Sequence, residues 1–230
     1  MGGFLHRNRK AMLFQIYLFV LFAGIGIGSV EYIRWRGKVL PASADIPPKI
    51  ALTFDDGPHP VCTKKLLDGL RERGVKATFF LIGKNIEGNE ALVRQMEQDG
   101  HLIGNHTWSH VDITKMSDEQ ACEEITKTSS LVRSITGHDT EYIRPPFGAW
   151  NKNLECGFAM FPVMWTIDPL DWKIQNTERI VEQVTAEARE NAIILLHDCY
   201  AASVEAAFQI VDRLEEQGYE FVTADQLVLE

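Results

Sequence analysis

Two adjacent carboxylates, Asp55 and Asp56, stand at the end of an apolar run that begins at Ile50, directly before Gly57 and Pro58. Neighbouring side chains on a regular strand point to opposite faces, so the two carboxylates can share a site only where the backbone turns. Gly57 and Pro58 supply such a turn. Two carboxylates held together repel, so the pair needs a proton, an arginine or a metal ion. On its own, the stretch also fits an ordinary turn after a buried strand.

A pair of histidines, His106 and His110, follows a later apolar segment. On a helical turn, residues four apart share a face, so both imidazoles can reach one ion. With one carboxylate of the aspartate pair they make three protein ligands, which leaves a coordination position open, as in catalytic divalent-metal sites. Taken alone, the pair also fits two surface histidines.

Single polar residues follow other apolar runs of the chain. Arg144 stands before two prolines, where it could orient a carboxylate or form an ordinary salt bridge. Asp168 and Asp171 follow another run, and His197 ends Ala192–His197, where a histidine buried in the core is common. The nearby aromatic residues fit either core packing or a groove that stacks sugar rings: Trp108, Phe147, Trp150 and Trp165.

Segments typical of β-strands alternate with helical patterns after residue 48. The predicted strands are Lys49–Asp56, Ala77–Gly83, His101–Asn105, Glu141–Arg144, Pro162–Asp168, Ala192–His197 and Tyr219–Thr223. The predicted helices are Thr63–Arg73, Asn89–Asp99, Ser117–Ile135, Thr177–Asn191 and Ser203–Gln217, the third with a Ser-Asp-Glu-Gln capping box. The alternation predicts an α/β fold whose parallel sheet closes, or nearly closes, into a barrel. The C-terminal strand ends of a barrel form one rim, so the polar residues should meet there.

An uncharged run of twenty residues, Ala11–Val30, is long enough to cross a bilayer as a helix. Arg7, Arg9 and Lys10 before it place the N-terminus in the cytoplasm, although basic residues after it weaken this bias. We expect a single-pass signal anchor in the cell membrane and an extracytoplasmic domain; the alternative is a domain secreted after cleavage near Ala44. The expected parts are a cytoplasmic N-terminus (1–10), the transmembrane anchor (11–30), a linker (31–47) and one globular domain (48–230).

The 230-residue chain carries a net charge of −9, and its first 44 residues are basic, so the remainder is more acidic than the whole. This charge argues against a nucleic-acid-binding protein, which needs a basic patch. The cysteines, Cys62, Cys122, Cys156 and Cys199, form no Cys-x-x-Cys pair, so no zinc ribbon is predicted. An exported domain could oxidise some of them, and free buried thiols fit the sequence equally well.

Five short motifs together resemble the polysaccharide deacetylase family, also called the NodB-like domain or carbohydrate esterase family 4. They are Thr53-Phe-Asp-Asp-Gly-Pro58, His106-Thr-Trp-Ser-His110, Arg144-Pro-Pro-Phe-Gly148, Asp168-Pro-Leu-Asp-Trp172 and Leu195-Leu-His197. The resemblance covers roughly residues 48–226 and includes bacterial deacetylases of peptidoglycan and chito-oligosaccharides. It implies a distorted (β/α)7 barrel, in agreement with the strand count.

The resemblance also implies a role for each of ten residues. The implied metal ligands are Asp56, His106 and His110; the general base is Asp55, oriented by Arg144; the general acid is His197, partnered by Asp171; and Phe147, Trp172 and Leu195 lie at the substrate or the oxyanion. The implied ion is zinc, with cobalt or nickel as alternatives. The implied reaction is the metal-assisted hydrolysis of an N-acetyl group on a hexosamine polymer.

An anchored domain outside the cytoplasm favours the N-acetylglucosamine of cell-wall peptidoglycan as the substrate. Chito-oligosaccharides, poly-N-acetylglucosamine and acetyl-xylan are alternatives within the family. A two-carboxylate glycosidase is disfavoured, because adjacent residues rarely span the ~5–9 Å that such enzymes need, and it leaves the histidines unexplained. A non-catalytic carbohydrate-binding protein on this scaffold is a further alternative. The expected partners are the polysaccharide and the membrane, with no nucleic acid, and the protein is expected to be a monomer.

Overall fold

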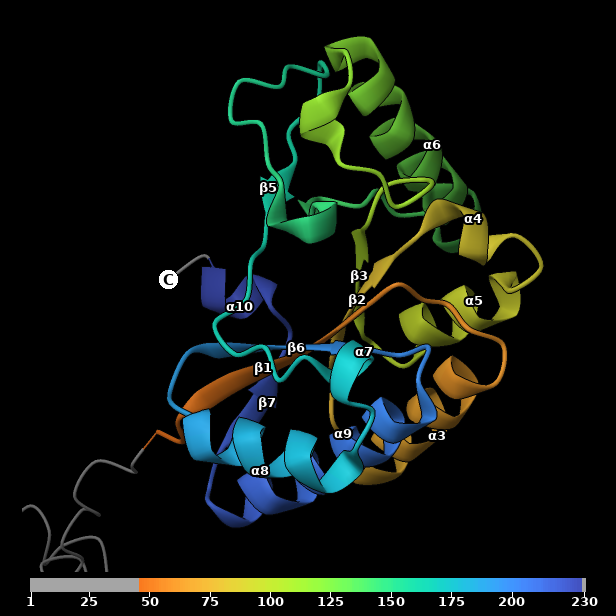
Figure 1. The fold of residues 1–230 in the computed structure, drawn as a ribbon. Helices are drawn as coiled ribbons and strands as arrows, with labels where there is room; N and C mark the ends of the chain where they lie inside the picture. The colour runs from red at the N-terminus through yellow and green to blue at the C-terminus, as the bar shows by residue number, and fades with distance from the viewer. Residues whose placement is uncertain (1–45, 229–230) are drawn as a thin grey trace, which may run out of the picture. The chain divides into compact units, whose positions relative to one another are not determined.

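Strands and helices alternate along the part of the chain that the computed structural model describes, residues 46–228 (Figure 1). The strands are β1 (Lys49–Asp55), β2 (Thr78–Leu81), β3 (Leu102–Asn105), β4 (Tyr142–Ile143), β5 (Phe161–Pro162), β6 (Ala192–His197) and β7 (Glu220–Val222). The α-helices are α3 (Cys62–Arg73), α4 (Gly83–Ile86), α5 (Glu90–Gln98), α6 (Asp118–Thr136), α7 (Asp171–Ile174), α8 (Thr177–Glu187), α9 (Ala201–Glu216) and α10 (Asp225–Val228). Two 3₁₀ turns are η1 (Ile113–Lys115) and η2 (Pro146–Gly148).

The strands form one parallel sheet in the order β5-β4-β3-β2-β1-β6, with β7 paired to the start of β1. An isolated bridge between Ile167 and Ile194 brings the segment after β5 back to β6. The predicted parallel α/β sheet is therefore confirmed, and its curvature fits a (β/α) barrel. The register places Asp55 opposite His197, so the last residues of β1 and β6 lie side by side.

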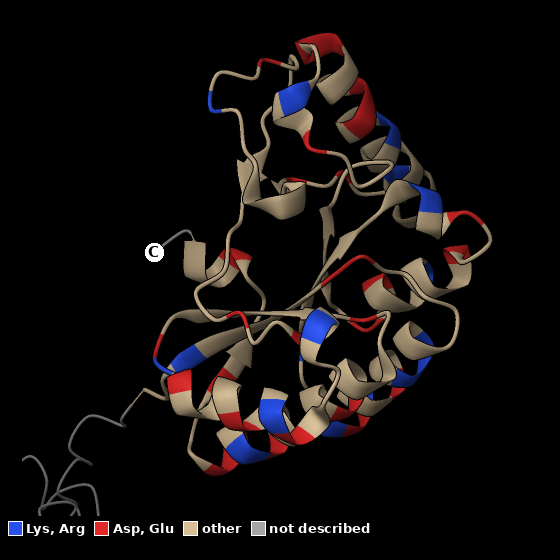
Figure 2. Cartoon of the chain, viewed as in Figure 1, with Lys and Arg blue, Asp and Glu red and all other residues tan. Residues whose placement is uncertain are grey.

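The central strands β1, β2 and β6 are buried on both faces, which explains why their sequences are nearly continuous apolar runs. One face of the sheet packs against α3, α8 and α9 through residues such as Leu66, Val181 and Ile210. Lysine, arginine, aspartate and glutamate gather mostly on the outer helices (Figure 2). A buried parallel sheet thus supports the strand ends that carry the polar motifs.

The fifth strand is much shorter than the predicted Pro162–Asp168, because β5 ends at Pro162. Proline has no N–H to extend the hydrogen-bond ladder. The Val163 N–H still donates to the Ile143 carbonyl at 2.8 Å, after which the chain leaves β4 and meets β6 at Thr166 and Ile167. This crossing carries the Asp168–Trp172 motif to the end of β6.

No helix among residues 46–228 has the length and apolar character needed to cross a membrane. The predicted spanning run at 11–30 lies outside the described residues, as does the linker before residue 46. The membrane anchor and the domain boundaries therefore stay predictions.

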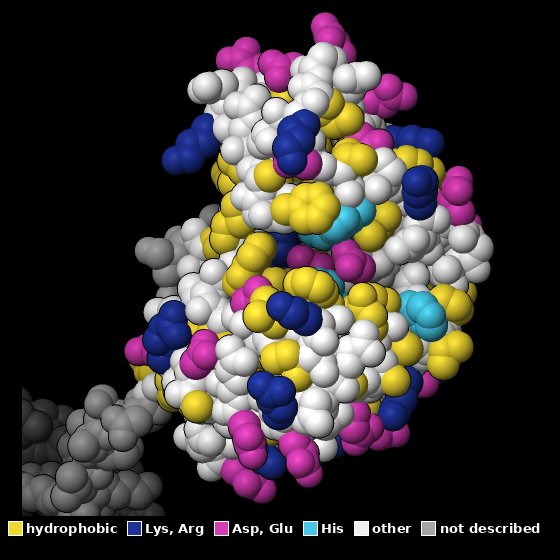
Figure 3. Space-filling model, viewed as in Figure 1, with side chains coloured by type: hydrophobic (Ala, Val, Ile, Leu, Met, Phe, Trp, Pro, Cys, Tyr) yellow, Lys and Arg dark blue, Asp and Glu magenta, His cyan; other side chains and the backbone are white. Residues whose placement is uncertain are grey.

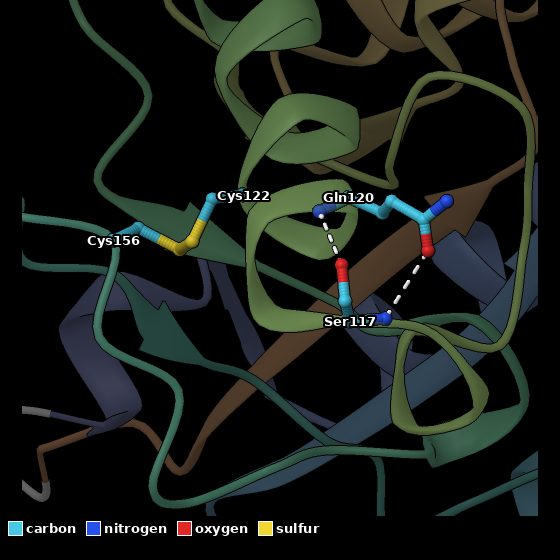
Figure 4. The surroundings of a disulfide bond; sticks show 4 residues. All are labelled: Ser117, Gln120, Cys122 and Cys156. Carbon is cyan, nitrogen blue, oxygen red and sulfur yellow. Dashed lines mark hydrogen bonds between the residues drawn. A yellow bond between two sulfur atoms is a disulfide. The ribbon is translucent and has the colours of Figure 1, made fainter.

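Cys122 and Cys156 form a disulfide, a pairing that the sequence left open (Figure 4). Cys122 lies near the start of α6, beside the predicted capping box. The capping box is confirmed, since the side chains of Ser117 and Gln120 each accept the other's backbone N–H. Cys156 lies in the irregular segment between η2 and β5. The bridge therefore ties this segment to α6, whereas Cys62 and Cys199 are free.

Removing the disulfide should lower the free energy of unfolding by about 4 kcal/mol, since a bridge across 34 residues restricts the unfolded chain by about that much. Urea unfolding of a variant with both Cys122→Ser and Cys156→Ser, compared with wild type, measures this. Cys62→Ser removes a free thiol and should change stability by less than about 1 kcal/mol. Equal stability of wild type and the double variant would contradict the prediction.

Candidate active site

Asp56, His106 and His110 bring three ligand atoms together, and these atoms all lie within 4.8 Å of one another. The Asp56 Oδ1 atom is 3.4 Å from Nε2 of His106 and 3.5 Å from Nε2 of His110. Figure 3 shows histidine and acidic side chains inside a hollow of the surface, with hydrophobic side chains on both sides. The structure thus brings together the three residues that the sequence predicts as metal ligands.

The aspartate pair shares this site because the backbone turns at the end of β1, as the sequence predicts. Asp55 is the last residue of β1, whereas Asp56 has a φ of 73°, in the left-handed region. The Asn85 side chain donates to the Asp56 carbonyl at 2.7 Å, and the Ile82 N–H donates to the Gly57 carbonyl at 3.0 Å. The segment after β2 therefore holds the turn in place.

The His106–His110 segment is an irregular loop after β3, so the predicted helical turn is wrong. Thr107 and His110 have φ values of 63° and 55°. The Asn105 carboxamide accepts the Thr107 N–H at 2.8 Å and thus satisfies an amide that a helix would pair elsewhere. The two imidazoles still converge, with ring centroids 4.9 Å apart.

The hydrogen bond made by His106 and the burial of His110 both suit metal binding. His106 Nδ1 lies 2.5 Å from the Arg144 carbonyl oxygen. A carbonyl can only accept, so Nδ1 donates to it, and Nε2, which faces Asp56, is the nitrogen left for a metal ion. Burial, together with repulsion from His106, lowers the pKa of His110. The neutral imidazole, the form that binds metals, is therefore favoured at His110.

Asp56 Oδ1 is buried and has no hydrogen-bond partner among the residues that the structure describes. An unpaired buried carboxylate oxygen is costly, and a cation between it and the two Nε2 atoms would remove that cost. Burial raises the pKa of Asp56, but the interaction with His106 and the charges of the surrounding histidines outweigh it, so the pKa is lowered. A carboxylate oxygen with two imidazole nitrogens is a ligand set that fits a divalent transition metal.

Arg144 is fully buried and holds Asp55 in one orientation. Its Nη1 donates to Asp55 Oδ1 at 2.9 Å and to Thr53 Oγ1 at 2.7 Å. Thr53 in turn donates to the Ile194 carbonyl at 2.6 Å. The sequence analysis did not single out Thr53, although it precedes Asp55 by two residues and so shares its face of β1. One Asp55 oxygen is thus fixed, and the other lies 3.8 Å from His106 Nε2.

Asp171 holds His197 through two hydrogen bonds. Its Oδ1 lies 2.7 Å from His197 Nδ1, and its Oδ2 accepts the His197 backbone N–H at 2.8 Å. Burial favours the neutral imidazole, but the hydrogen bond and charge of Asp171, with the charges of Asp55 and Asp56, raise the pKa of His197 to about 9. His197 Nε2 lies 3.9 Å from Asp56 Oδ2, so a protonated nitrogen faces the ligand cluster at neutral pH.

The three predicted substrate residues differ in exposure. Phe147 is 70% exposed and Trp172 is 47% exposed, so both offer apolar surface. The Phe147 ring lies edge-on to His110, with centroids 4.9 Å apart. Leu195 is buried in β6, where it shares a strand face with His197.

Trp108 is a structural residue of this region. Its ring packs so closely on Gly83 that a Cβ there would lie 2.3 Å from it. The Lys127 ammonium lies 3.7 Å from the centroid of the same ring. Trp108 therefore packs the histidine loop against α4 and α6. This packing role explains why a tryptophan stands between the two histidines of the His106–His110 motif.

Asp198 is a fully buried carboxylate to which the sequence analysis assigned no role. Burial, with the charges of Asp56 and Asp55, raises its pKa to about 7, although Thr63 Oγ1 donates to it at 2.5 Å. A Cβ at Gly57 would lie 2.3 Å from its Oδ2. Asp198 therefore packs directly against the turn that carries Asp55 and Asp56. Its position directly after His197, at the end of β6, is the feature of the sequence that could have identified it as a residue of this site.

Comparisons with known proteins identify the family of this chain. A family model described as polysaccharide deacetylase matches residues 43–159. The chain is 38% identical over 191 residues to the peptidoglycan-N-acetylmuramic acid deacetylase PdaC of Bacillus subtilis, covering 82% of this chain and 41% of that protein. It is 38% identical over 198 residues to the peptidoglycan-N-acetylglucosamine deacetylase PgdA of Listeria monocytogenes, covering 83% of this chain and 42% of that protein.

The fold is shared as well. A solved structure of peptidoglycan deacetylase PdaC from Bacillus subtilis matches with a TM-score of 0.76 at 38% identity, covering 79% of this chain and 90% of that one. The chain nevertheless spans less than half the length of the two curated relatives above. The family model covers half of the sequence and includes the aspartate pair, both ligand histidines and Arg144. The family model, the similar relatives and the shared fold show that the chain belongs to the polysaccharide deacetylase family.

Proposed function

We propose that this protein is a metal-dependent hydrolase that removes N-acetyl groups from a hexosamine polymer. The main support is the cluster of Asp56, His106 and His110, whose ligand atoms converge around a buried, unpaired carboxylate oxygen. These three residues would hold the ion, with zinc as the proposed metal and cobalt or nickel as alternatives. When bound, such an ion supplies Lewis-acid polarisation of the acetyl carbonyl and activation of water.

Asp55 and His197 are proposed as the general base and the general acid. Arg144 holds one Asp55 oxygen, which leaves the other to take the proton of the attacking water. Asp171 holds Nδ1 of His197, so Nε2 carries the proton that passes to the leaving nitrogen. The amide C–N bond breaks, and acetate and a free amine result.

The groove beside these groups would bind the sugar. Phe147 and Trp172 are exposed and can lie against the apolar faces of a sugar ring, with Leu195 as a buried wall. The backbone N–H near Phe147 is the proposed oxyanion donor. Phe147 has a φ of 60°, a conformation that costs energy and is common at such sites.

N-acetylglucosamine in peptidoglycan is the proposed substrate. The printed names of the relatives support a cell-wall polymer, although one names N-acetylmuramic acid and the other N-acetylglucosamine. Acetate release from peptidoglycan, chito-oligosaccharides and acetyl-xylan would rank these substrates. Mass spectrometry of digested peptidoglycan would locate the freed amine on one sugar or the other. If the protein binds these polymers but releases no acetate from any of them, it is a non-catalytic carbohydrate-binding protein and the proposed activity is wrong.

Alanine in place of His106, His110 or Asp56 should abolish high-affinity binding of one divalent ion per chain, together with acetate release. The three residues supply all the ligand atoms of the cluster, so two remaining ligands hold an ion poorly. Metal analysis after dialysis measures the first effect. His138→Ala changes an exposed histidine on the surface and is the matched control. Full metal retention in all three ligand variants would refute the assignment.

We also propose that residues 11–30 anchor the chain in the cell membrane, with the catalytic domain outside the cytoplasm. The Cys122–Cys156 disulfide supports this, because disulfides persist mainly in oxidising compartments. Fractionation should place the intact chain with the membrane. A soluble form whose N-terminus begins at Asp45 would instead favour secretion after cleavage.

A further inference from the structure

The loop that carries both ligand histidines is held in an unfavourable backbone conformation. Thr107 and His110 both lie in the left-handed region, with φ values of 63° and 55°. For residues other than glycine this conformation is disfavoured, because it brings Cβ too close to a backbone carbonyl oxygen. Contacts from outside the loop must therefore offset this cost and keep His110 turned toward Asp56.

Two elements provide these contacts, and they act on different backbone groups. From α4, the Gly83 and Lys84 N–H groups donate to the carbonyls of Thr107 and Trp108, both at 3.0 Å. These bonds hold the first half of the loop. The second half, which carries His110, needs a separate anchor.

Glu124 of α6 is that anchor. Its Oε2 accepts the backbone N–H of Ser109 at 2.8 Å, and its Oε1 accepts the Ser109 hydroxyl at 2.8 Å. Glu124 is only half-buried, yet both of its oxygens are used for one residue, directly before His110. Hydrogen bonds to a carboxylate are stronger than those between neutral groups, so this pair opposes the strain in this half of the loop.

We propose that Glu124 is a positioning residue for the metal site, which acts through Ser109 to hold His110 in its ligating orientation. The inference rests on the proposed metal site and adds to it a residue that contacts neither the ion nor the substrate. Partners that orient metal ligands typically change metal affinity by about 10–100-fold when removed. Glu124 lies outside the five sequence motifs, on α6, and reaches the loop through its two hydrogen bonds to Ser109.

The test measures the affinity of the full chain for Co²⁺ by calorimetric titration of the metal-free protein. Glu124→Ala removes both acceptors and should weaken Co²⁺ binding by about tenfold or more. Glu124→Gln should stay within about threefold of wild type, because its oxygen can accept the Ser109 N–H while its amide donates to the hydroxyl. Glu123→Ala changes the exposed neighbouring residue and should leave the affinity unchanged.

A purely structural role would lower the unfolding midpoint of the metal-free Glu124→Ala protein without changing its Co²⁺ affinity. Wild-type affinity in folded Glu124→Ala would therefore overturn the inference while leaving the metal site in place. If Glu124→Ala does not fold, Glu124→Leu, which is close in size and has no acceptor, should show the same tenfold loss. Failure of the wild type to bind Co²⁺ would overturn the metal site itself and the inference with it.

Discussion

Asp55→Asn should lower the turnover number by about 10²–10⁴-fold, the usual contribution of a general base, while the bound metal is retained. Asparagine has the shape of aspartate and can still accept the Arg144 hydrogen bond at 2.9 Å, but it cannot take a proton from water. The metal should remain, because the three converging ligand atoms belong to other residues. Acetate release and metal content, measured on the same preparation, separate the two effects.

The stability of this variant must be measured as well, because Arg144 is fully buried and would lose its anionic partner. Breaking a buried ion pair on one side commonly costs about 3–5 kcal/mol. Activity should therefore be compared at a temperature where circular dichroism shows both proteins folded. Asp56→Asn is the matched comparison at the adjacent position, and it should lose metal as well as activity. Loss of metal from Asp55→Asn, or its near-normal turnover, would contradict the division of roles between the two aspartates.

Much of this site could be predicted from sequence because its residues stand at the ends of buried parallel strands. The apolar runs that end at Asp55 and His197 fix two neighbouring strands, and their register then places the two residues opposite each other. Arg144 follows β4, and its bond to Asp55 joins positions 89 residues apart. Such strand ends must converge in any barrel of this kind, whatever the details of the loops.

The parts that could not be predicted depend on contacts that the local sequence does not contain. The histidine loop takes left-handed conformations because Asn105 and Glu124 accept its amides, and the second of these lies on a distant helix. The pairing of Cys122 with Cys156 depends on where the chain runs after η2. The short β5 follows from Pro162 and from the need to cross toward β6, which an apolar pattern alone does not reveal.

The role of His197 depends on which of its protonation states is populated at working pH. Burial alone would favour the neutral imidazole. A neutral imidazole carries only one N–H, and the bond to Asp171 would keep that proton on Nδ1. Nε2 would then have no proton to donate. The bond to Asp171 and the charges of Asp55 and Asp56 reverse this and raise the pKa of His197 to about 9. A bound cation would offset the charges of Asp55 and Asp56, so the bond to Asp171 would then be the main support of the imidazolium.

The alkaline limb of the pH–rate profile should therefore lie between pH 6.5 and about 9, because activity is lost as His197 deprotonates through its folded-state pKa. His197→Ala should lower turnover by about 10²–10⁴-fold and abolish this limb in the remaining activity. Asp171→Asn keeps the shape of the partner but removes its charge, so the alkaline limb should move to lower pH. At pH values below this limb, the loss of turnover should be smaller than in His197→Ala. Metal content should stay constant in both variants, since neither residue belongs to the ligand cluster. An unchanged alkaline limb in His197→Ala would show that another group titrates there, and His197 would then not be the general acid.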